Sequence, residues 1–206
     1  DGAGGFRAGE QASGIAVNAI KEAVKVHEIN DAVMRDAVLN GIEAANQQII
    51  ELGMGAATTV VAVEISGSTI RPYHVGDSLI LVVGQKGKIK LQTVSHSPVG
   101  YAVEAGLLGE DEALQHDDLH LVSNIVGLPD MRIEIGAAID LDPNDTLVLA
   151  SDGLSDNLYI EEIVEYVRKG PIEKAAINLA KACHERMLSS DSETPSKPDD
   201  MSFFLY

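Results

Sequence analysis

Four aspartates stand beside glycine or other turn-forming residues at the ends of segments expected to be β-strands. They are Asp1 in Asp-Gly-Ala-Gly-Gly, Asp77 in Val-Gly-Asp-Ser, Asp152 in Ala-Ser-Asp-Gly-Leu-Ser-Asp and Asp199 in Pro-Asp-Asp-Met-Ser. A fifth acid, Asp156, follows Asp152 by four residues. Glycine has no Cβ, so a backbone containing it can approach a ligand closely. Carboxylates gathered at one edge would repel one another and raise their pKa values unless cations fill the site.

The donor atoms of these motifs indicate a hard metal ion. Carboxylate, carbonyl and water oxygens suit Mg²⁺ or Mn²⁺, and no His/Cys pattern suggests zinc. Taken singly, each aspartate is more readily explained as part of a turn, because Asp-Gly is a common hairpin signal. The combination is more specific than its parts, because the four acids border apolar strands in a fixed order.

The elements that must position these acids come as helix pairs and as runs of strands. Apolar residues at three- and four-residue spacings predict a helix over 8–26, and a second runs to about residue 52, with Asn30 and Asp31 as caps. Runs of β-branched residues between glycine-containing turns then predict an antiparallel meander. The predicted strands are 58–65, 69–75, 78–83, 89–93, 131–135, 146–150 and 201–206, and the later helices are 160–168 and 172–188.

The order of these elements predicts an α+β fold with antiparallel sheets, because strands and helices do not alternate. Two sheets stacked face to face, each covered by a helix pair, would bury every apolar face in a four-layer α-β-β-α sandwich. The segment 95–125 is expected to be mostly irregular, with a short helix at 110–115. A connection this long in a compact domain is usually functional or mobile.

Composition excludes some classes of protein. The formal net charge of −17 argues against a nucleic-acid binder, whose affinity rests on Lys and Arg. It does not exclude a phosphorylated substrate, because bound divalent cations invert the local field. No apolar run approaches the roughly 18–20 residues of a membrane span, so no membrane partner is expected.

The sequence also suggests a compartment and a domain count. Cys183 is the only cysteine, so an intramolecular disulfide is impossible, and we interpret it as a core residue. With no signal peptide at the start of the sequence, we expect a cytoplasmic protein. Because the sequence opens inside a motif and without methionine, we expect one catalytic domain over 1–206 that lacks its N-terminal strands, with an additional domain upstream as an alternative.

The order of the motifs resembles the type 2C (PPM) metal-dependent serine/threonine protein phosphatases, and bacterial members in particular. The matching segments span the whole chain and are Asp-Gly-x-Gly-Gly, Gly-Ala-Ala-Thr-Thr-Val-Val-Ala, Val-Gly-Asp-Ser, Ser-His-Ser, Leu-Ala-Ser-Asp-Gly-Leu-Ser-Asp and Asp-Asp-Met-Ser. The family fold, a central β-sandwich flanked by helices, agrees with the layers predicted above. The resemblance implies hydrolysis of phosphoserine and phosphothreonine in proteins.

The resemblance also implies a site for two or three Mg²⁺ or Mn²⁺ ions. Asp1 would bridge two of them, with the Gly2 carbonyl reaching one directly or through water. Asp152 and Asp199 would complete the shell of the first ion, and Asp1 and Asp152 are the acids expected to be central to catalysis. In this family's mechanism, a water bridging the two cations loses its proton and attacks phosphorus in line.

A third, weaker ion is implied in bacterial-type members. Asp77 and Asp152 would hold it together with Asp156. Segment 95–127 would be the flap beside the site. Within that segment, His96 is a candidate for fixing the flap, whereas His74 is expected to be a packed strand residue rather than a ligand.

Some departures from the family pattern leave a second hypothesis open. The family carries an acidic metal ligand and often an arginine upstream of the Asp-Gly motif. Ala3 stands where many members have a histidine, Leu79 follows Gly-Asp-Ser where arginine is usual, and Ser95 replaces an aspartate. The alternative to an active phosphatase is therefore a catalytically impaired module that binds a partner or phosphopeptide. A calcium-binding domain is disfavoured because the dense Asp-x-Asp-x-Asp loop is missing.

Overall fold

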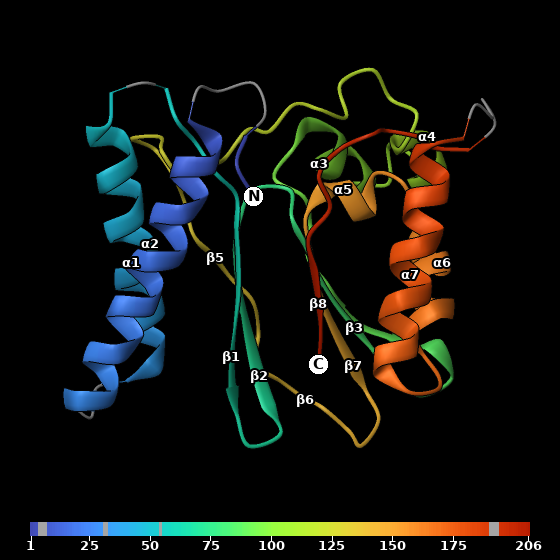
Figure 1. Ribbon diagram of the computed structural model, residues 1–206, viewed down its shortest axis with the longest axis horizontal. Coiled ribbons are helices and arrows are strands. Elements are labelled where there is room, and N and C mark those ends of the chain that lie inside the picture. Colours follow the sequence, from blue (N-terminus) through green and yellow to red (C-terminus); the bar gives the residue numbers. More distant parts are fainter. Residues whose placement is uncertain (4–7, 31–32, 54, 190–193) are drawn as a thin grey trace. The chain divides into compact units, whose positions relative to one another are not determined.

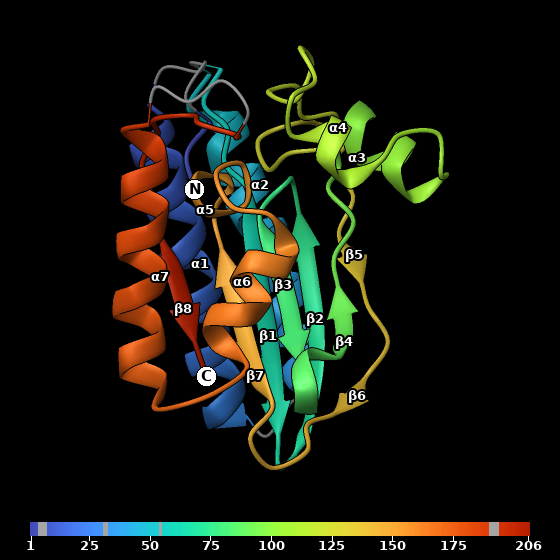
Figure 2. The ribbon, with the colours of Figure 1, turned by 90° about the vertical axis from the view of Figure 1, so that its right-hand side faces the viewer.

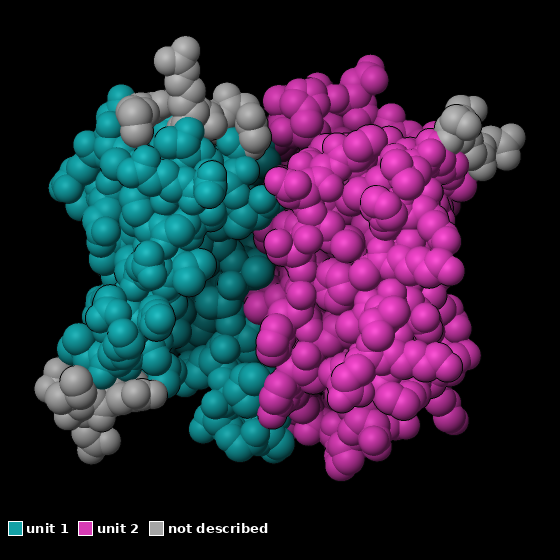
Figure 3. Space-filling model, in the orientation of Figure 1, with its two compact units in different colours: residues 1–76, 122–139 teal, residues 77–121, 140–206 magenta. Residues whose placement is uncertain are grey.

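The computed structural model describes residues 1–3, 8–30, 33–53, 55–189 and 194–206. The chain divides into two units, which Figure 3 shows in different colours. The first comprises residues 1–76 and 122–139, and the second comprises 77–121 and 140–206. Each unit contains an antiparallel sheet and a pair of longer helices (Figure 1).

The first unit begins with an antiparallel helix pair, α1 (Gly9–Asn30) and α2 (Met34–Glu51), as the sequence predicts. Gly41 of α2 permits the close approach of the two helices, because a Cβ there would lie 2.7 Å from the Cα of Ile20. The predicted end of the second helix near residue 52 is confirmed: α2 ends at Glu51, and Gly53 follows with a left-handed φ of 63°, which glycine adopts without strain. The predicted caps are wrong where described: the N-cap of α2 is Val33, and Asn30 ends α1. Asp31 lies outside the described residues.

The sheet of the first unit is built on a hairpin of β1 (Val60–Ser66) and β2 (Thr69–Val75). The short strands β5 (Glu134–Ile135) and β6 (Ile139–Asp140) both pair with β2. Tyr73 and Val75 of β2 are fully buried and pack in one cluster with α1 and α2. The helix pair thus covers one face of this sheet.

The second unit has a sheet in the order β4-β3-β7-β8, with every pair antiparallel. Its strands are β3 (Leu79–Val83), β4 (Ile89–Gln92), β7 (Thr146–Ala150) and β8 (Phe203–Leu205). All five residues of β3 are buried, which explains why its sequence is a continuous apolar run rather than an alternating one. Candidate acids adjoin three of these strands: Asp77 precedes β3, Asp152 follows β7 and Asp199 precedes β8.

Two helices, α6 (Ile160–Val167) and α7 (Ile172–Met187), pack on the sheet of the second unit (Figure 2). Cys183 of α7 is fully buried in their common core, and its Sγ donates to the Gly153 carbonyl at 3.2 Å. The interpretation of Cys183 as a core residue is therefore confirmed. The short 3₁₀ turn η1 (Gln85–Gly87) connects β3 to β4.

The segment between β4 and β5 is more helical than predicted. It contains α3 (Pro98–Glu104) and α4 (Glu110–Ala113), of which only α4 falls in the range predicted from the sequence. Ser97 caps α3 by accepting a hydrogen bond from the Gly100 N–H at 2.9 Å, and Pro98 occupies the first helical position, where its missing N–H costs nothing. The Ser-His-Ser motif is thus a helix start.

The predicted class, α+β with two antiparallel sheets and helix pairs, is confirmed. None of the helices among the described residues has the length and apolarity needed to cross a bilayer. The prediction of one domain over 1–206 that lacks N-terminal strands stays a prediction, as does the cytoplasmic location.

Candidate metal centre

The most specific motif of the sequence forms a tight strand-to-helix connection. β7 ends at Ala150, Ser151 is the N-cap, and the one-turn helix α5 (Asp152–Ser155) follows at once. The Asp156 N–H donates to the Asp152 carbonyl at 2.8 Å. Residues four apart lie on one face of a helix, so this turn places the side chains of Asp152 and Asp156 on the same side.

A lysine ammonium joins these carboxylates. Lys197 Nζ donates to Asp156 Oδ2 at 2.7 Å and to Asp152 Oδ2 at 2.9 Å, and it lies 3.8 Å from Asp199 Oδ2. Burial acts to lower the pKa of Lys197, but the hydrogen bonds and charges of Asp156 and Asp152 outweigh it and raise the pKa overall. Three of the predicted ligands in the second unit therefore surround one cation.

Asp77 belongs to the same electrostatic cluster. It follows Gly76, which has a φ of 107°. A Cβ at position 76 would lie only 2.7 Å from the Thr59 side chain, so glycine is required there. Burial, and then the charge of Asp152, raise the pKa of Asp77 to about 6. For Asp156, burial raises the pKa to about 7 against the lowering influence of Lys197, with the charges of Asp152 and Asp77 adding to the rise. The positive charge of Lys197 thus offsets only part of the cost of burying these two carboxylates.

Asp199 is held beside α5 by the chain that leads into β8. The Ser151 N–H donates to the Ser202 carbonyl at 2.9 Å, and the Ser202 N–H donates to Ser151 Oγ at 3.1 Å. The Asp200 carbonyl occupies the space where a Cβ of Gly153 would lie. Glycine is therefore required at this position for the Asp199 segment to lie against α5.

Asn157 is a site residue that the sequence analysis missed. Its amide nitrogen donates to the carbonyls of Gly153 (2.9 Å) and Lys197 (2.8 Å), and its Oδ1 accepts from the Lys197 N–H at 2.7 Å. Its side chain is fully buried. The feature of the sequence that could have indicated a role for Asn157 is its position directly after Asp156. Asn157 fixes the backbone of Lys197 against α5.

Asp1 and Gly2 belong to the first unit, where they extend the sheet edge. The Thr59 N–H donates to the Asp1 carbonyl at 2.8 Å, Gly2 bridges to Thr58, and the Ala3 N–H donates to the Ala57 carbonyl at 3.1 Å. The other predicted ligands lie in the second unit. The bridging role of Asp1 and the role of the Gly2 carbonyl therefore stay predictions.

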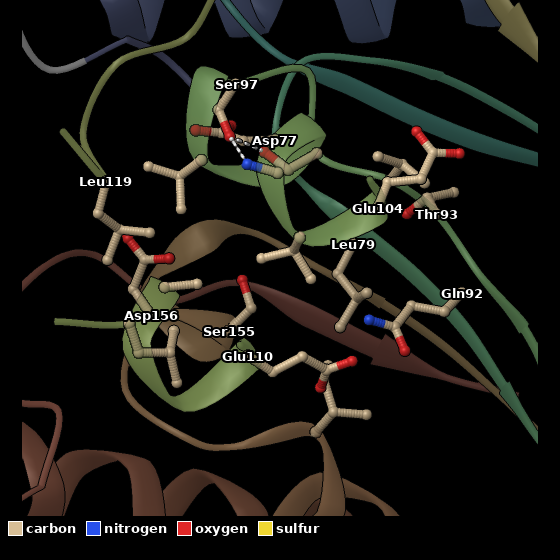
Figure 4. Close-up of a pocket in the computed structure, with 18 of the residues that line it drawn as sticks. Asp77, Leu79, Gln92, Thr93, Ser97, Glu104, Glu110, Leu119, Ser155 and Asp156 are labelled. Carbon is tan, nitrogen blue, oxygen red and sulfur yellow. Dashed lines mark hydrogen bonds between the residues drawn. The ribbon is translucent and has the colours of Figure 1, made fainter. Parts of the chain in front are cut away.

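A cavity of about 360 Å³ adjoins the cluster within the second unit (Figure 4). Asp77 and Asp156 contribute to its lining, and apolar side chains from β3, α3 and the loop after α5 form much of its wall. Glu104 and Glu110 also line it, and among the described lining residues none is basic. A cavity with apolar walls and acidic groups suits an apolar or positively charged part of a ligand.

The remaining sequence-based candidates have structural roles. His74 is buried in β2 in register with Glu134 of β5, which agrees with a packed strand residue. His96 is buried and stacks on Tyr101 of α3, with ring centroids 6.4 Å apart, in keeping with a role in fixing the flap. Leu79 is buried in the core of the second unit and lines the cavity. Ser95 Oγ donates to Ser97 Oγ at 2.9 Å at the start of α3.

Comparisons with known proteins agree with these features. The family model for protein phosphatase 2C matches residues 1–188. A protein phosphatase 2C-type protein of Streptococcus pyogenes serotype M6 is 35% identical over 175 residues, which cover 80% of this chain and 69% of that protein. The serine/threonine phosphatase of S. agalactiae is 33% identical with a TM-score of 0.75, over 90% of this chain and 79% of that one. Stp1 of Staphylococcus aureus, also a serine/threonine phosphatase, is 25% identical with a TM-score of 0.82, over 100% and 80%.

Proposed function

The chain belongs to the protein phosphatase 2C family and is a bacterial-type serine/threonine protein phosphatase, and we propose that it depends on two or three Mg²⁺ or Mn²⁺ ions. The proposed ligands in the second unit are Asp77, Asp152, Asp156 and Asp199. The proposed ligands in the first unit are Asp1 and Gly2, and Asp1 and Asp152 are proposed as the acids central to catalysis.

The observation that carries the metal proposal is the convergence of carboxylates in the second unit. Asp152, Asp156 and Asp199 surround a single ammonium group, and Asp77 lies close enough for its pKa to rise under the charge of Asp152. Every donor is an oxygen, which is the chemistry that Mg²⁺ and Mn²⁺ prefer. The raised pKa values of Asp77 and Asp156 indicate carboxyls that lack sufficient positive charge. The residues present therefore fit a divalent cation.

The protein's own residues supply binding and orientation. Held by these carboxylates, a divalent cation would supply Lewis-acid activation of water for hydrolysis of the phosphate ester. Asn157 and the Ser151–Ser202 hydrogen bonds fix the backbone that carries the carboxylates, so the carboxylates themselves need little rearrangement when a cation binds. The cavity beside Asp77 and Asp156 can take a side chain that neighbours the phosphorylated residue of the substrate.

Phosphate release from a phosphothreonine peptide tests the proposal. Turnover is expected with Mn²⁺ and is expected to stop on addition of EDTA. Asp152→Asn should lower kcat/KM by about 100-fold or more, because it removes one charge from the group that orients the reacting atoms. A matched variant, Asp130→Asn, changes an exposed acid on the first unit and should leave turnover unchanged. Full activity of Asp152→Asn would contradict the proposed site, and a folded, metal-binding protein without turnover would favour a binding module.

A further inference from the structure

Lys197 is placed among the carboxylates by contacts at both its backbone and its ammonium group. Its ammonium donates to Asp156 and Asp152 at 2.7 and 2.9 Å, and these two side chains are only 12% and 19% exposed. Its backbone N–H and carbonyl are both bonded to the side chain of Asn157. A surface lysine that met an acid by chance would not have its backbone held in this way, so the position of the ammonium is built into the fold.

The ammonium is hydrogen-bonded to carboxylate oxygens of Asp152 and Asp156 that are proposed as metal ligands. A lysine ammonium is a compact charge with three donors, and here two of them are used on Asp152 and Asp156 while Asp199 lies nearby. A divalent cation bound to the same oxygens would meet this positive charge at close range. Because like charges repel strongly at such distances, the two cations exclude each other from the Asp152–Asp156 pair.

We propose that Lys197 is an internal counter-cation that competes with the divalent metal for Asp152 and Asp156. This inference rests on the proposed metal-dependent function. Metal binding at this pair then requires the ammonium to swing toward solvent. The side chain of Lys197 is 34% exposed and has a flexible four-carbon stem, so it can do so while Asn157 still holds the backbone. The lysine thereby weakens metal binding here and stabilises the metal-free protein.

Titration calorimetry with Mn²⁺ alone tests the competition without any need for turnover. Lys197→Met removes the charge and keeps most of the stem, and it should tighten the weakest detectable Mn²⁺ site by about tenfold or more. Lys197→Arg keeps the charge and should not tighten it. The control Lys181→Met removes an exposed lysine from α7 and should leave every Mn²⁺ affinity unchanged. In an Asp156→Asn background, the effect of Lys197→Met should shrink, because the shared partner is then uncharged.

Thermal unfolding gives an independent measurement and shows whether the variants fold. In EDTA, Lys197→Met should unfold at a lower temperature than the parent protein, and saturating Mn²⁺ should close or reverse that gap. Lys197→Gln serves as a second neutral variant should the methionine variant fail to fold. Equal or weaker Mn²⁺ binding in the neutral variants would overturn the inference, as would no binding by any of the proteins. Turnover in Mn²⁺ with an affinity indifferent to Lys197 would overturn this inference alone. Tightened binding without turnover would instead contradict the proposed function.

Discussion

At the scale of single residues, the sequence predicts the candidate aspartates of the site. It does not predict the residues that contact them, Lys197 and Asn157. Asp77 and Asp152 are correctly predicted to lie at strand ends, because a change from apolar residues to Gly-Asp-Ser or Ser-Asp-Gly marks each boundary locally. The roles of Lys197 and Asn157 come from contacts between residues about forty positions apart. Nothing in their local sequence records these contacts.

Asn157 offers a test of this support for the site. Asn157→Ala leaves the N–H and the carbonyl of Lys197 without their side-chain partner, and it removes one of the two side-chain donors to the Gly153 carbonyl. Such losses reduce the free energy of unfolding by about 2–4 kcal/mol. Mn²⁺ affinity should also change, because the chain before Asp199 loses the hydrogen bonds that fix Lys197 against α5, although the Ser151–Ser202 bonds remain. Denaturant unfolding and calorimetry would measure both effects, with the exposed Asn18→Ala on α1 as a control. A stable variant with unaltered Mn²⁺ affinity would mean that Asn157 does not position the site.

At the scale of elements, the predictions succeeded where a pattern is long or sharply bounded. β2, β7, α6 and α7 were predicted to within a residue because apolar periodicity and flanking glycine or proline agree. α3 was missed because Pro98 and Gly100 suggest a loop, although proline is well placed at a helix start. α5 was missed because a single turn is too short to show a period.

The contact between α5 and the chain before β8 requires a glycine at position 153, because any Cβ there would collide with that chain. In Gly153→Ala the new Cβ would collide with the Asp200 carbonyl, so either α5 or the Asp199 segment must shift. We expect the free energy of unfolding to fall by about 2 kcal/mol or more, as is usual for overpacking, and Mn²⁺ binding to weaken. Gly14→Ala in α1 is the matched control, because no atom lies within 4 Å of its Cβ position. That substitution should stabilise the helix by about 0.5–1 kcal/mol. Unfolding and Mn²⁺ titration of the two variants would decide the matter, and identical behaviour would exclude a packing role for Gly153.

At the scale of the whole molecule, charge is the property that the sequence states most directly. The net charge of −17 is consistent with the proposed metal-dependent site, in which bound cations rather than basic side chains would bind the phosphate group of the substrate. The division into two units, with Asp1 in one and Asp152 in the other, is a further property of this scale. Local patterns do not reveal it, because the second unit is assembled from the discontinuous segments 77–121 and 140–206.

The acidity of the chain and of its cavity should set a preference among phosphopeptides. Glu104 and Glu110 line the cavity beside Asp77 and Asp156. Burial raises the pKa of Glu110, and the negative charges of Glu161 and Asp111 add to the rise. A phosphothreonine peptide with flanking lysine or arginine should therefore be hydrolysed with a kcat/KM at least several-fold above that of a peptide with flanking glutamate.

Salt separates this electrostatic preference from a purely steric one. Raising the ionic strength from about 0.01 to 1 M shortens the screening length from about 30 to 3 Å, so the ratio of kcat/KM between basic and acidic peptides should fall toward one. Glu110→Gln should reduce the ratio at low salt, whereas Glu173→Gln, an exposed acid on α7 that does not line the cavity, should leave it unchanged. Steady-state kinetics on both peptides would measure these ratios. A preference that survives high salt would show that cavity shape, and not charge, selects the substrate, because screening leaves steric fit intact.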